Sequence, residues 1–163
     1  MKHGFCPGQF FDSGFFLLPR FGRWRSTPAW AVPRWDTGTV VLAEKLYLIG
    51  GDWGGQETRV DIYDPEIDSW SRGPDLSITL CEADASTLII RDRIIVIGGQ
   101  IQENGKAGSA IWALSKDRWE TAGQLSEPRI LPVAGIIDGK LYIAGGSFDG
   151  DHPLPEMWSC DAP

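Results

Sequence analysis

The sequence KLYLIGG at residues 45–51 returns as RIIVIGG at 93–99 and as KLYIAGG at 140–146. Each copy is a short, mostly apolar run that is typical of a buried strand. Each run ends in a pair of glycines, which tolerate a positive φ and the close approach of a neighbouring backbone. The first glycines of the pairs are 48 and 47 residues apart, so the sequence predicts a structural repeat of about 47 residues.

Aromatic residues follow the same period. Trp70 and Trp119 stand 20 and 21 residues after the first glycine of their pairs, and Tyr63 and Trp112 precede them by seven residues. We expect these rings to fill the space between neighbouring repeats, where each large ring contributes about 1.5–3 kcal/mol. The sequence therefore predicts a structural motif that recurs along the chain. Its members are Gly50, Gly51, Tyr63, Trp70, Gly98, Gly99, Trp112, Trp119, Gly145 and Gly146.

The second repeat contains four strand-length runs, at residues 86–90, 94–97, 109–113 and 118–122. Turn-forming residues separate them. Arg91-Asp92 and Asp138-Gly139 each join a first run to a second, and Asp-Gly is a strong signal for a type I′ hairpin turn. Four antiparallel strands per repeat, repeated at this spacing, describe the blade of a β-propeller.

The combined pattern of apolar run, glycine pair, aromatic residue and tryptophan resembles the kelch repeat, and DIYDPEIDSW at residues 61–70 is similar to that family's third-strand signature. The resemblance implies an all-β fold: a partial kelch-type β-propeller of four-stranded antiparallel blades, as a fragment of a six-bladed ring. Some positions depart from the pattern. By simple spacing, Glu82 stands where the other repeats have Arg34 and Arg129, and Ala113-Leu114 stands where the first repeat has Asp64-Pro65.

We expect one propeller-type domain in which residues 1–24 form the back half of a blade with a frayed N-terminus. Residues 25–70 and 71–119 form two full repeats, and residues 120–163 form a truncated third. An open array of blades leaves unpaired strand edges. Two interpretations follow: the chain is a piece of a longer protein, or two copies associate to complete a ring.

Composition limits the partners and the compartment. The formal net charge of −7 disfavours nucleic acid and anionic membrane surfaces, which both require a cationic protein surface. No stretch approaches the ~20 apolar residues that span a bilayer. Cys6, Cys81 and Cys160 are scattered and odd in number, so we expect reduced thiols rather than disulfides or metal ligands. This favours a cytoplasmic location.

The sequence offers no catalytic constellation, and we predict neither an enzyme nor a cofactor. Its two histidines are His3 and His152, and His152 lies in the loop SFDGDH at residues 147–152. Asp149 and His152 in that loop match no metal-binding spacing, which favours an acidic turn over a metal site.

Binding loops are the better candidates for function. The loops between the second and third strands, at residues 52–58, 100–108 and 147–155, differ in composition while the rest of the repeat stays constant. They supply the binding candidates Trp53, Gln56, Gln100, Phe148, Asp149 and His152. Trp53 is an apolar ring in a polar loop, which is typical of an interface hot spot, although packing across the adjacent blade is an equal alternative.

Arg34 and Arg129 precede a first strand at equivalent positions. In kelch propellers that bind acidic peptides, arginines at this position line the pocket, so the resemblance implies that both contact an anion. The alternative is a structural hydrogen bond or ion pair between blades.

Two functions remain open at this point. The first is an interaction module that presents its loops to a protein or peptide. The second is a fragment of a carbohydrate-active propeller enzyme, because kelch-type propellers also occur in galactose-oxidase-like enzymes and in a sialic acid mutarotase. QLSEPR at residues 124–129 resembles stretches of such bacterial proteins.

Overall fold

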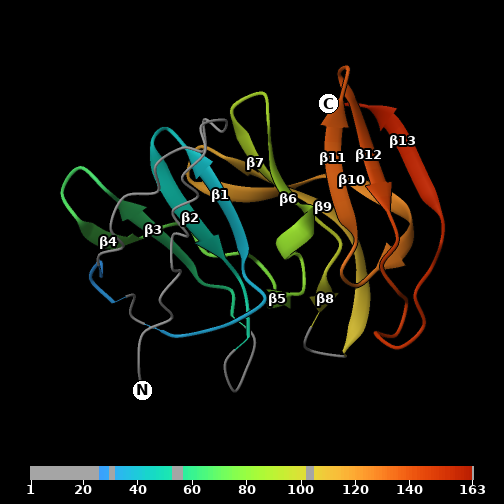
Figure 1. The fold of residues 1–163 in the computed structure, drawn as a ribbon, viewed down its shortest axis with the longest axis horizontal. Coiled ribbons are helices and arrows are strands. Elements are labelled where there is room, and N and C mark those ends of the chain that lie inside the picture. The colour runs from blue at the N-terminus through green and yellow to red at the C-terminus, as the bar shows by residue number, and fades with distance from the viewer. Residues whose placement is uncertain (1–25, 30–31, 53–56, 102–104, 163) are drawn as a thin grey trace, which may run out of the picture.

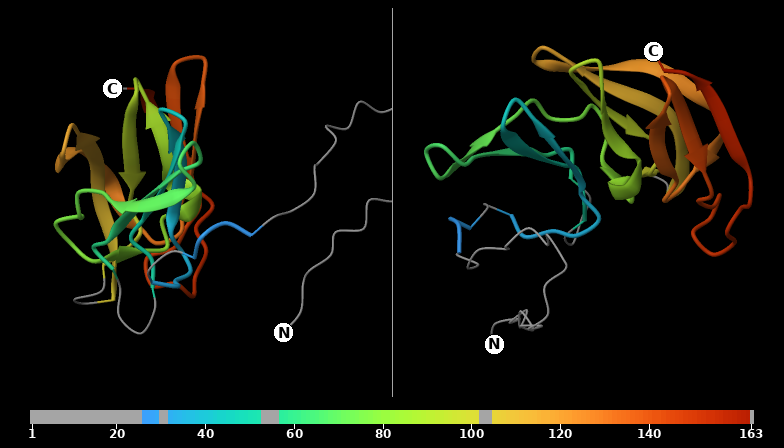
Figure 2. Two further views of the ribbon diagram at one scale, coloured as in Figure 1. Left: turned by 90° about the vertical axis from the view of Figure 1, so that its left-hand side faces the viewer. Right: turned by 45° about the horizontal axis from the view of Figure 1, so that its top comes forward.

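The chain folds into β-strands with almost no helix. The computed structural model describes residues 26–29, 32–52, 57–101 and 105–162. Within these residues the strands form antiparallel sheets, and the helical content is one short 3₁₀ segment, η1 (Asp84–Ser86). Three sheets stand side by side in the order of the chain, with the first and third at the two ends of the array (Figures 1 and 2). The prediction of an all-β fold made of four-stranded antiparallel blades is confirmed.

The first sheet contains β1 (Gly38–Leu42), β2 (Lys45–Ile49), β3 (Val60–Asp64) and β4 (Ser69–Arg72), in that order. The second contains β6 (Thr87–Ile90), β7 (Arg93–Ile97), β9 (Lys106–Ser115) and β10 (Arg118–Arg129), with β5 (Leu80–Cys81) and β8 (Gln100–Ile101) attached. The third contains β11 (Val133–Ile137), β12 (Lys140–Ala144) and β13 (Met157–Asp161). The predicted loop at residues 100–108 is therefore wrong in part, since β8 pairs with the start of β9.

Each first hairpin closes through two residues with positive φ, which is the geometry of a type I′ turn. Arg91-Asp92 has φ values of 49° and 60°, and Asp138-Gly139 has 50° and 76°, as predicted. Ala43-Glu44 adopts the same turn with φ values of 50° and 60°. Its sequence contains no turn-forming residue, so position within the repeat, and not local composition, places this turn.

The second sheet is buried on both faces, and this explains its uninterrupted apolar run RIIVI. Alternate side chains of a strand point to opposite faces. Ile94 and Val96 join a cluster with Val40, Ile49 and Val60 of the first sheet. Ile95 and Ile97 join a second cluster with Leu141 and Ile143 of the third sheet. The core of the molecule therefore lies between blades.

Trp119 is buried in the first of these clusters, and its Nε1 donates a hydrogen bond of 2.9 Å to the carbonyl oxygen of Pro74. Trp70 donates in the same way to Pro28, at 2.8 Å. Each tryptophan thus ties the last strand of its blade to the segment that precedes the blade. Trp112 does not share the place of Tyr63, however. Tyr63 pairs with Trp70, whereas Leu114 pairs with Trp119, because the turn at residues 115–118 is two residues shorter.

The second glycine of each pair packs on the backbone that leads into its own blade. A Cβ atom placed on Gly51 would lie 2.8 Å from the carbonyl oxygen of Trp35. The corresponding distances are 2.7 Å from Gly99 to the carbonyl of Cys81 and 2.5 Å from Gly146 to that of Ile130. Real Cβ atoms do not approach this closely, so every one of these positions requires glycine.

The glycine pairs also connect successive sheets. The amide of Gly51 donates to the carbonyl oxygen of Leu80, and that of Gly99 donates to the carbonyl oxygen of Arg129, both at 2.9 Å. Leu80 lies in β5, ahead of the first strand of the second blade, and Arg129 is the last residue of β10, just ahead of the third blade. A side chain on Gly98 would clash with the Arg129 carbonyl as well, at 2.7 Å. The glycine pair therefore holds two blades together through backbone contacts.

Alanine substitution at two glycines distinguishes two contributions to the free energy of unfolding: the close backbone contact and the strain of a positive φ. Gly99 and Gly150 have φ values of 90° and 88°, but nothing lies within 4 Å of a Cβ placed on Gly150. We expect Gly150→Ala to lower the free energy of unfolding by ~1–2 kcal/mol through backbone strain alone. Gly99→Ala should cost ~1–3 kcal/mol more, because the added methyl group meets a backbone carbonyl. Urea denaturation measures both, and equal losses would contradict the packing role.

Candidate functional site

One end of the sheet array brings together segments from all three sheets. Backbone pairs join Trp35 to Asp52, Cys81 to Gln100 and Ile130 to Ser147. Each pair places the segment before a blade beside the loop that follows its glycine pair. We call this end the mouth; it comprises residues 34–37, 52, 80–84, 100–101, 129–132 and 147–152.

The pairing pattern corrects the expected position of Glu82. Because Trp35, Cys81 and Ile130 are equivalent, the residue equivalent to Arg34 and Arg129 is Leu80. Glu82 instead shares the place of Asp36 and Leu131, and these three residues have positive φ values of 54°, 52° and 50°. The second repeat has two extra residues between this segment and its first strand. They are accommodated in the stretch that forms η1, and sequence spacing alone placed Glu82 incorrectly.

The side chain of Arg34 is fully buried and makes hydrogen bonds within its own blade. Its Nε donates to the carbonyl oxygen of Gly50 at 2.7 Å, and its Nη1 forms an ion pair with Asp61 at 2.7 Å. Asp61 also pairs with Arg59 at 2.7 Å. Burial alone would raise the pKa of Asp61, but hydrogen bonds from Arg59 and Arg34 outweigh it and hold that pKa below its ordinary value.

Arg129 is equally buried but has a different environment. Its guanidinium lies 4.6 Å from the ring centre of Phe148 and 4.3 Å from that of Trp158, which are cation–π contacts. Nη2 reaches Glu127 at 3.0 Å and Glu156 at 3.6 Å. Trp158 stands in the third sheet where Asp61 stands in the first, since it pairs with Ile143 as Asp61 pairs with Leu48. The ring of Trp158 therefore takes the place of the Asp61 carboxylate. Nε of Arg129 has no hydrogen-bond partner among the described residues.

Neither guanidinium is on the surface of the mouth, since both side chains have 0% exposure. In this structure both arginines make structural contacts. Arg34 pairs with Asp61 in the first blade, whereas Arg129 ends β10 and contacts Phe148 and Trp158 of the third repeat. Direct contact with an anion stays a proposal that would require these side chains to move.

The charge that the mouth presents is negative. Asp36, Asp52, Glu82 and Asp84 interact electrostatically, and none of them forms an ion pair with another described residue. Partial burial, followed by repulsion from Asp84 and Asp52, raises the pKa of Asp36. Burial, followed by repulsion from Asp36, Asp84 and Asp52, raises that of Glu82. Burial, followed by repulsion from Glu82, Asp52 and Asp36, raises the pKa of the Cys81 thiol to about 12, so it stays protonated and unreactive.

Exposed apolar side chains accompany these carboxylates. Trp35, Leu131 and Phe148 are all exposed. Sequence analysis missed Trp35 and Leu131, because residues at their equivalent positions differ in type and burial. Cys81 takes the place of Trp35 and is buried.

The remaining candidates are placed as follows. Gln100 donates to the carbonyl oxygen of Gly105 at 3.3 Å. Asp149 bonds His152 at 2.8 Å, and both are solvent-exposed. That bond and two backbone amides lower the pKa of Asp149 to about 2, and the same carboxylate raises the pKa of His152. Trp53 and Gln56 lie outside the described residues.

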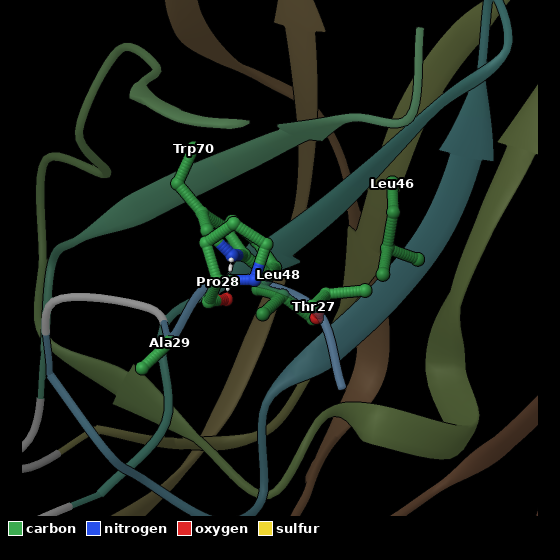
Figure 3. Close-up of a pocket in the computed structure, with 6 residues that line it drawn as sticks. All are labelled: Thr27, Pro28, Ala29, Leu46, Leu48 and Trp70. Carbon is green, nitrogen blue, oxygen red and sulfur yellow. Dashed lines mark hydrogen bonds between the residues drawn. The ribbon is translucent and has the colours of Figure 1, made fainter. Parts of the chain in front are cut away.

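A cavity of about 400 Å³ lies away from the mouth, on the face of the first sheet that is turned away from the second. Thr27, Pro28, Ala29, Leu46, Leu48 and Trp70 line it (Figure 3). The matching positions of the second sheet, Ile94, Val96 and Trp119, are buried against the first sheet. The cavity therefore lies on the face of the first sheet that corresponds to the face of the second sheet covered by the first.

Two features are absent from the described residues. No three His, Cys, Asp or Glu side chains gather where they would hold a metal ion. No helix in this part of the chain has the length and apolar character needed to cross a membrane.

The buried pair of Arg34 and Asp61 gives a pH-dependent prediction. Asp61→Asn should lower the free energy of unfolding by ~3–5 kcal/mol at neutral pH, because Arg34 stays buried without its carboxylate. Since folding lowers the pKa of Asp61, the stabilisation is present above its ordinary value of 3.8 and is lost as the pH falls through the lowered value. The gap between variant and wild type should close in acid.

The matched control is Asp64→Asn. Asp64 pairs with Lys45 at the same distance of 2.7 Å, but these side chains are 45% (Lys45) and 17% (Asp64) exposed, against 0% for Arg34 and 3% for Asp61, so the loss should be smaller. Urea unfolding across a pH series distinguishes the two variants. Equal losses at neutral pH would contradict the importance of the buried pair.

Comparison with known proteins agrees with this geometry. Residues 33–77 match the Kelch motif family. The Kelch repeat protein M-T8 of Myxoma virus (strain Lausanne) is 31% identical over 140 residues, which cover 82% of this chain and 26% of that protein. The Kelch repeat and BTB domain-containing protein 1 of Cowpox virus (strain Brighton Red) is 28% identical, with 94% and 29% covered.

The chain thus spans little more than a quarter of the length of these relatives. The solved structure of YjhT shares the fold, with a TM-score of 0.76 at 14% identity over 86% of this chain and 53% of that one. The repeats, the blade architecture and the matched motif together establish that this chain belongs to the kelch-repeat β-propeller family.

Proposed function

We propose that this chain is an interaction module that binds a protein or peptide segment at the mouth. The proposal rests on one contrast: the backbone repeats from blade to blade, whereas the surface residues at equivalent positions differ. Asp36, Glu82 and Leu131 share one backbone position and one conformation, but two of them are acidic and the third is apolar. Loops on a rigid scaffold commonly carry recognition. The relatives are named as kelch-repeat proteins, and several names include a BTB domain.

The partner that fits this mouth is basic. Arg34 and Arg129 are buried beside carboxylates of their own blades, so their charge is not available at the surface. Four carboxylates at the mouth lack an ion pair among the described residues, and a cation would relieve their mutual repulsion. The exposed rings of Trp35 and Phe148 supply apolar contact area beside them. We therefore propose a peptide that carries several lysine or arginine side chains around an apolar side chain.

Peptide binding tests this proposal directly. The probe is a fluorescein-labelled nonapeptide of alternating serine and lysine with a central leucine, and its counterpart has glutamate in place of lysine. Fluorescence anisotropy should show binding of the lysine peptide, weakened by added salt. The double variant Asp36→Asn, Glu82→Gln should weaken this binding about tenfold, as expected for the loss of two charge contacts.

The matched control removes the same two charges at the opposite end of the blades. Asp92 and Asp117 lie in the turns β6–β7 and β9–β10, away from the mouth. Asp92→Asn with Asp117→Asn should leave binding almost unchanged. Preference for the glutamate peptide would still support peptide binding at the mouth but would contradict the proposal that the partner is basic. Failure of both peptides to bind would count against the mouth as the interaction surface. No described feature favours the carbohydrate-active alternative, which stays a hypothesis from the sequence.

A further inference from the structure

The second repeat carries an insertion at the mouth that the first and third repeats lack. Its two extra residues lie in the stretch that forms η1. η1 is the short coiled ribbon near the centre of Figure 1, and it contacts β1 of the first sheet and β11 of the third. Both neighbouring sheets are thus present around this insertion, and it lies where the three sheets meet.

Buried hydrogen bonds hold the insertion in one conformation. Ser86 is fully buried, and its Oγ donates to the carbonyl oxygen of Ile97, at the end of β7, at 2.6 Å. Oγ1 of Thr87 donates to the carbonyl oxygen of Ala83 at 2.7 Å. Ala83 is itself buried in the cluster between the first and second sheets. The backbone of the insertion is therefore fixed to the blade beneath it.

This fixed backbone carries two carboxylates. The carbonyl oxygen of Glu82 accepts a hydrogen bond of 3.1 Å from the amide of Leu131, which ties the segment to the third repeat as well. Asp84 is exposed, and its carboxylate is not an acceptor in the hydrogen bonds that fix the turn. After burial, repulsion from Asp84 is among the causes that raise the pKa values of Asp36 and Glu82.

The arrangement lowers stability and prepares a binding surface at the same time. Like charges that are held near one another repel, and the Asp84 carboxylate makes no hydrogen bond in the turn that would offset this repulsion. A fixed group of carboxylates needs no rearrangement when a cation arrives, so it binds the cation at a lower cost. Such an exchange of stability for function is common at functional sites.

We propose that this insertion determines the specificity of the mouth, and that Asp84 binds one lysine or arginine side chain of the partner together with Asp36 and Glu82. The inference rests on the proposed function and assigns the basic group of the partner to one place in the mouth. Ser86 is a positioning residue in this account, because it holds the backbone beneath Asp84 and does not touch the partner.

Variants of the insertion test this assignment with the labelled lysine peptide. Asp84→Asn should weaken binding about tenfold and make it less dependent on salt, because one charge contact is lost. Its free energy of unfolding in urea should not fall, since repulsion from Asp36 and Glu82 is relieved. The matched control is Asp117→Asn in the β9–β10 turn, which should leave binding unchanged.

A double-mutant cycle tests the positioning role of Ser86. Ser86→Ala should weaken binding although the net charge is unchanged. If Ser86 acts by holding Asp84 in place, Ser86→Ala should have little further effect once Asp84→Asn is present, whereas a merely structural role would give additive losses. Circular dichroism confirms that each variant is folded.

Unchanged binding by Asp84→Asn would overturn this inference and leave the proposed function standing, because the wild-type chain would still bind the lysine peptide. A matching loss of stability in Asp84→Asn would overturn it as well, since the residue would then support the fold. Additive losses in the cycle would overturn the role of Ser86. Failure of the wild-type chain to bind the lysine peptide would overturn this inference together with the basic partner.

Discussion

The hydrogen bond from the second glycine of a pair to the backbone of the next blade is the constraint on which the fold depends. Gly51 and Gly99 donate to Leu80 and Arg129 at 2.9 Å, while their own blades press a carbonyl group against the other side of each glycine. Only a residue without a side chain fits between two backbones at this distance. The contact sets the spacing of the sheets, which then pack through the apolar clusters on both faces of β7.

The charge of the mouth depends on residue pairs that lie near this contact. One pair of positions, before the first strand and on the third strand of each blade, holds Arg34 with Asp61, Leu80 with Trp112 and Arg129 with Trp158. An ion pair, two apolar residues and a cation–π contact thus occupy equivalent places in the three blades. Because a buried charge requires a partner, both arginines are neutralised inside the protein. The surface charge of the mouth comes from Asp36, Asp52, Glu82 and Asp84 and is negative.

Sequence patterns predicted the features that depend on local chemistry. Glycine pairs, apolar runs and the Asp138-Gly139 turn have specific backbone requirements, and these identified the blades. Features that depend on register were not predictable. The two extra residues near η1 move Glu82 out of line with Arg34, and the short turn at residues 115–118 moves Trp112 out of line with Tyr63. Burial of the arginines was left open for the same reason, because only pairing places Asp61 and Trp158 beside them.

Amide hydrogen exchange of Gly99 tests the central claim most directly. If its bond to the Arg129 carbonyl joins the second and third blades, this amide should exchange only with global unfolding, at the rate of Ile95 in the middle of β7. The amide of Gly105, in the turn before β9, should exchange much faster. Exchange of Gly99 at the rate of Gly105 would show that the glycine pair is a loop end and does not hold the blades together.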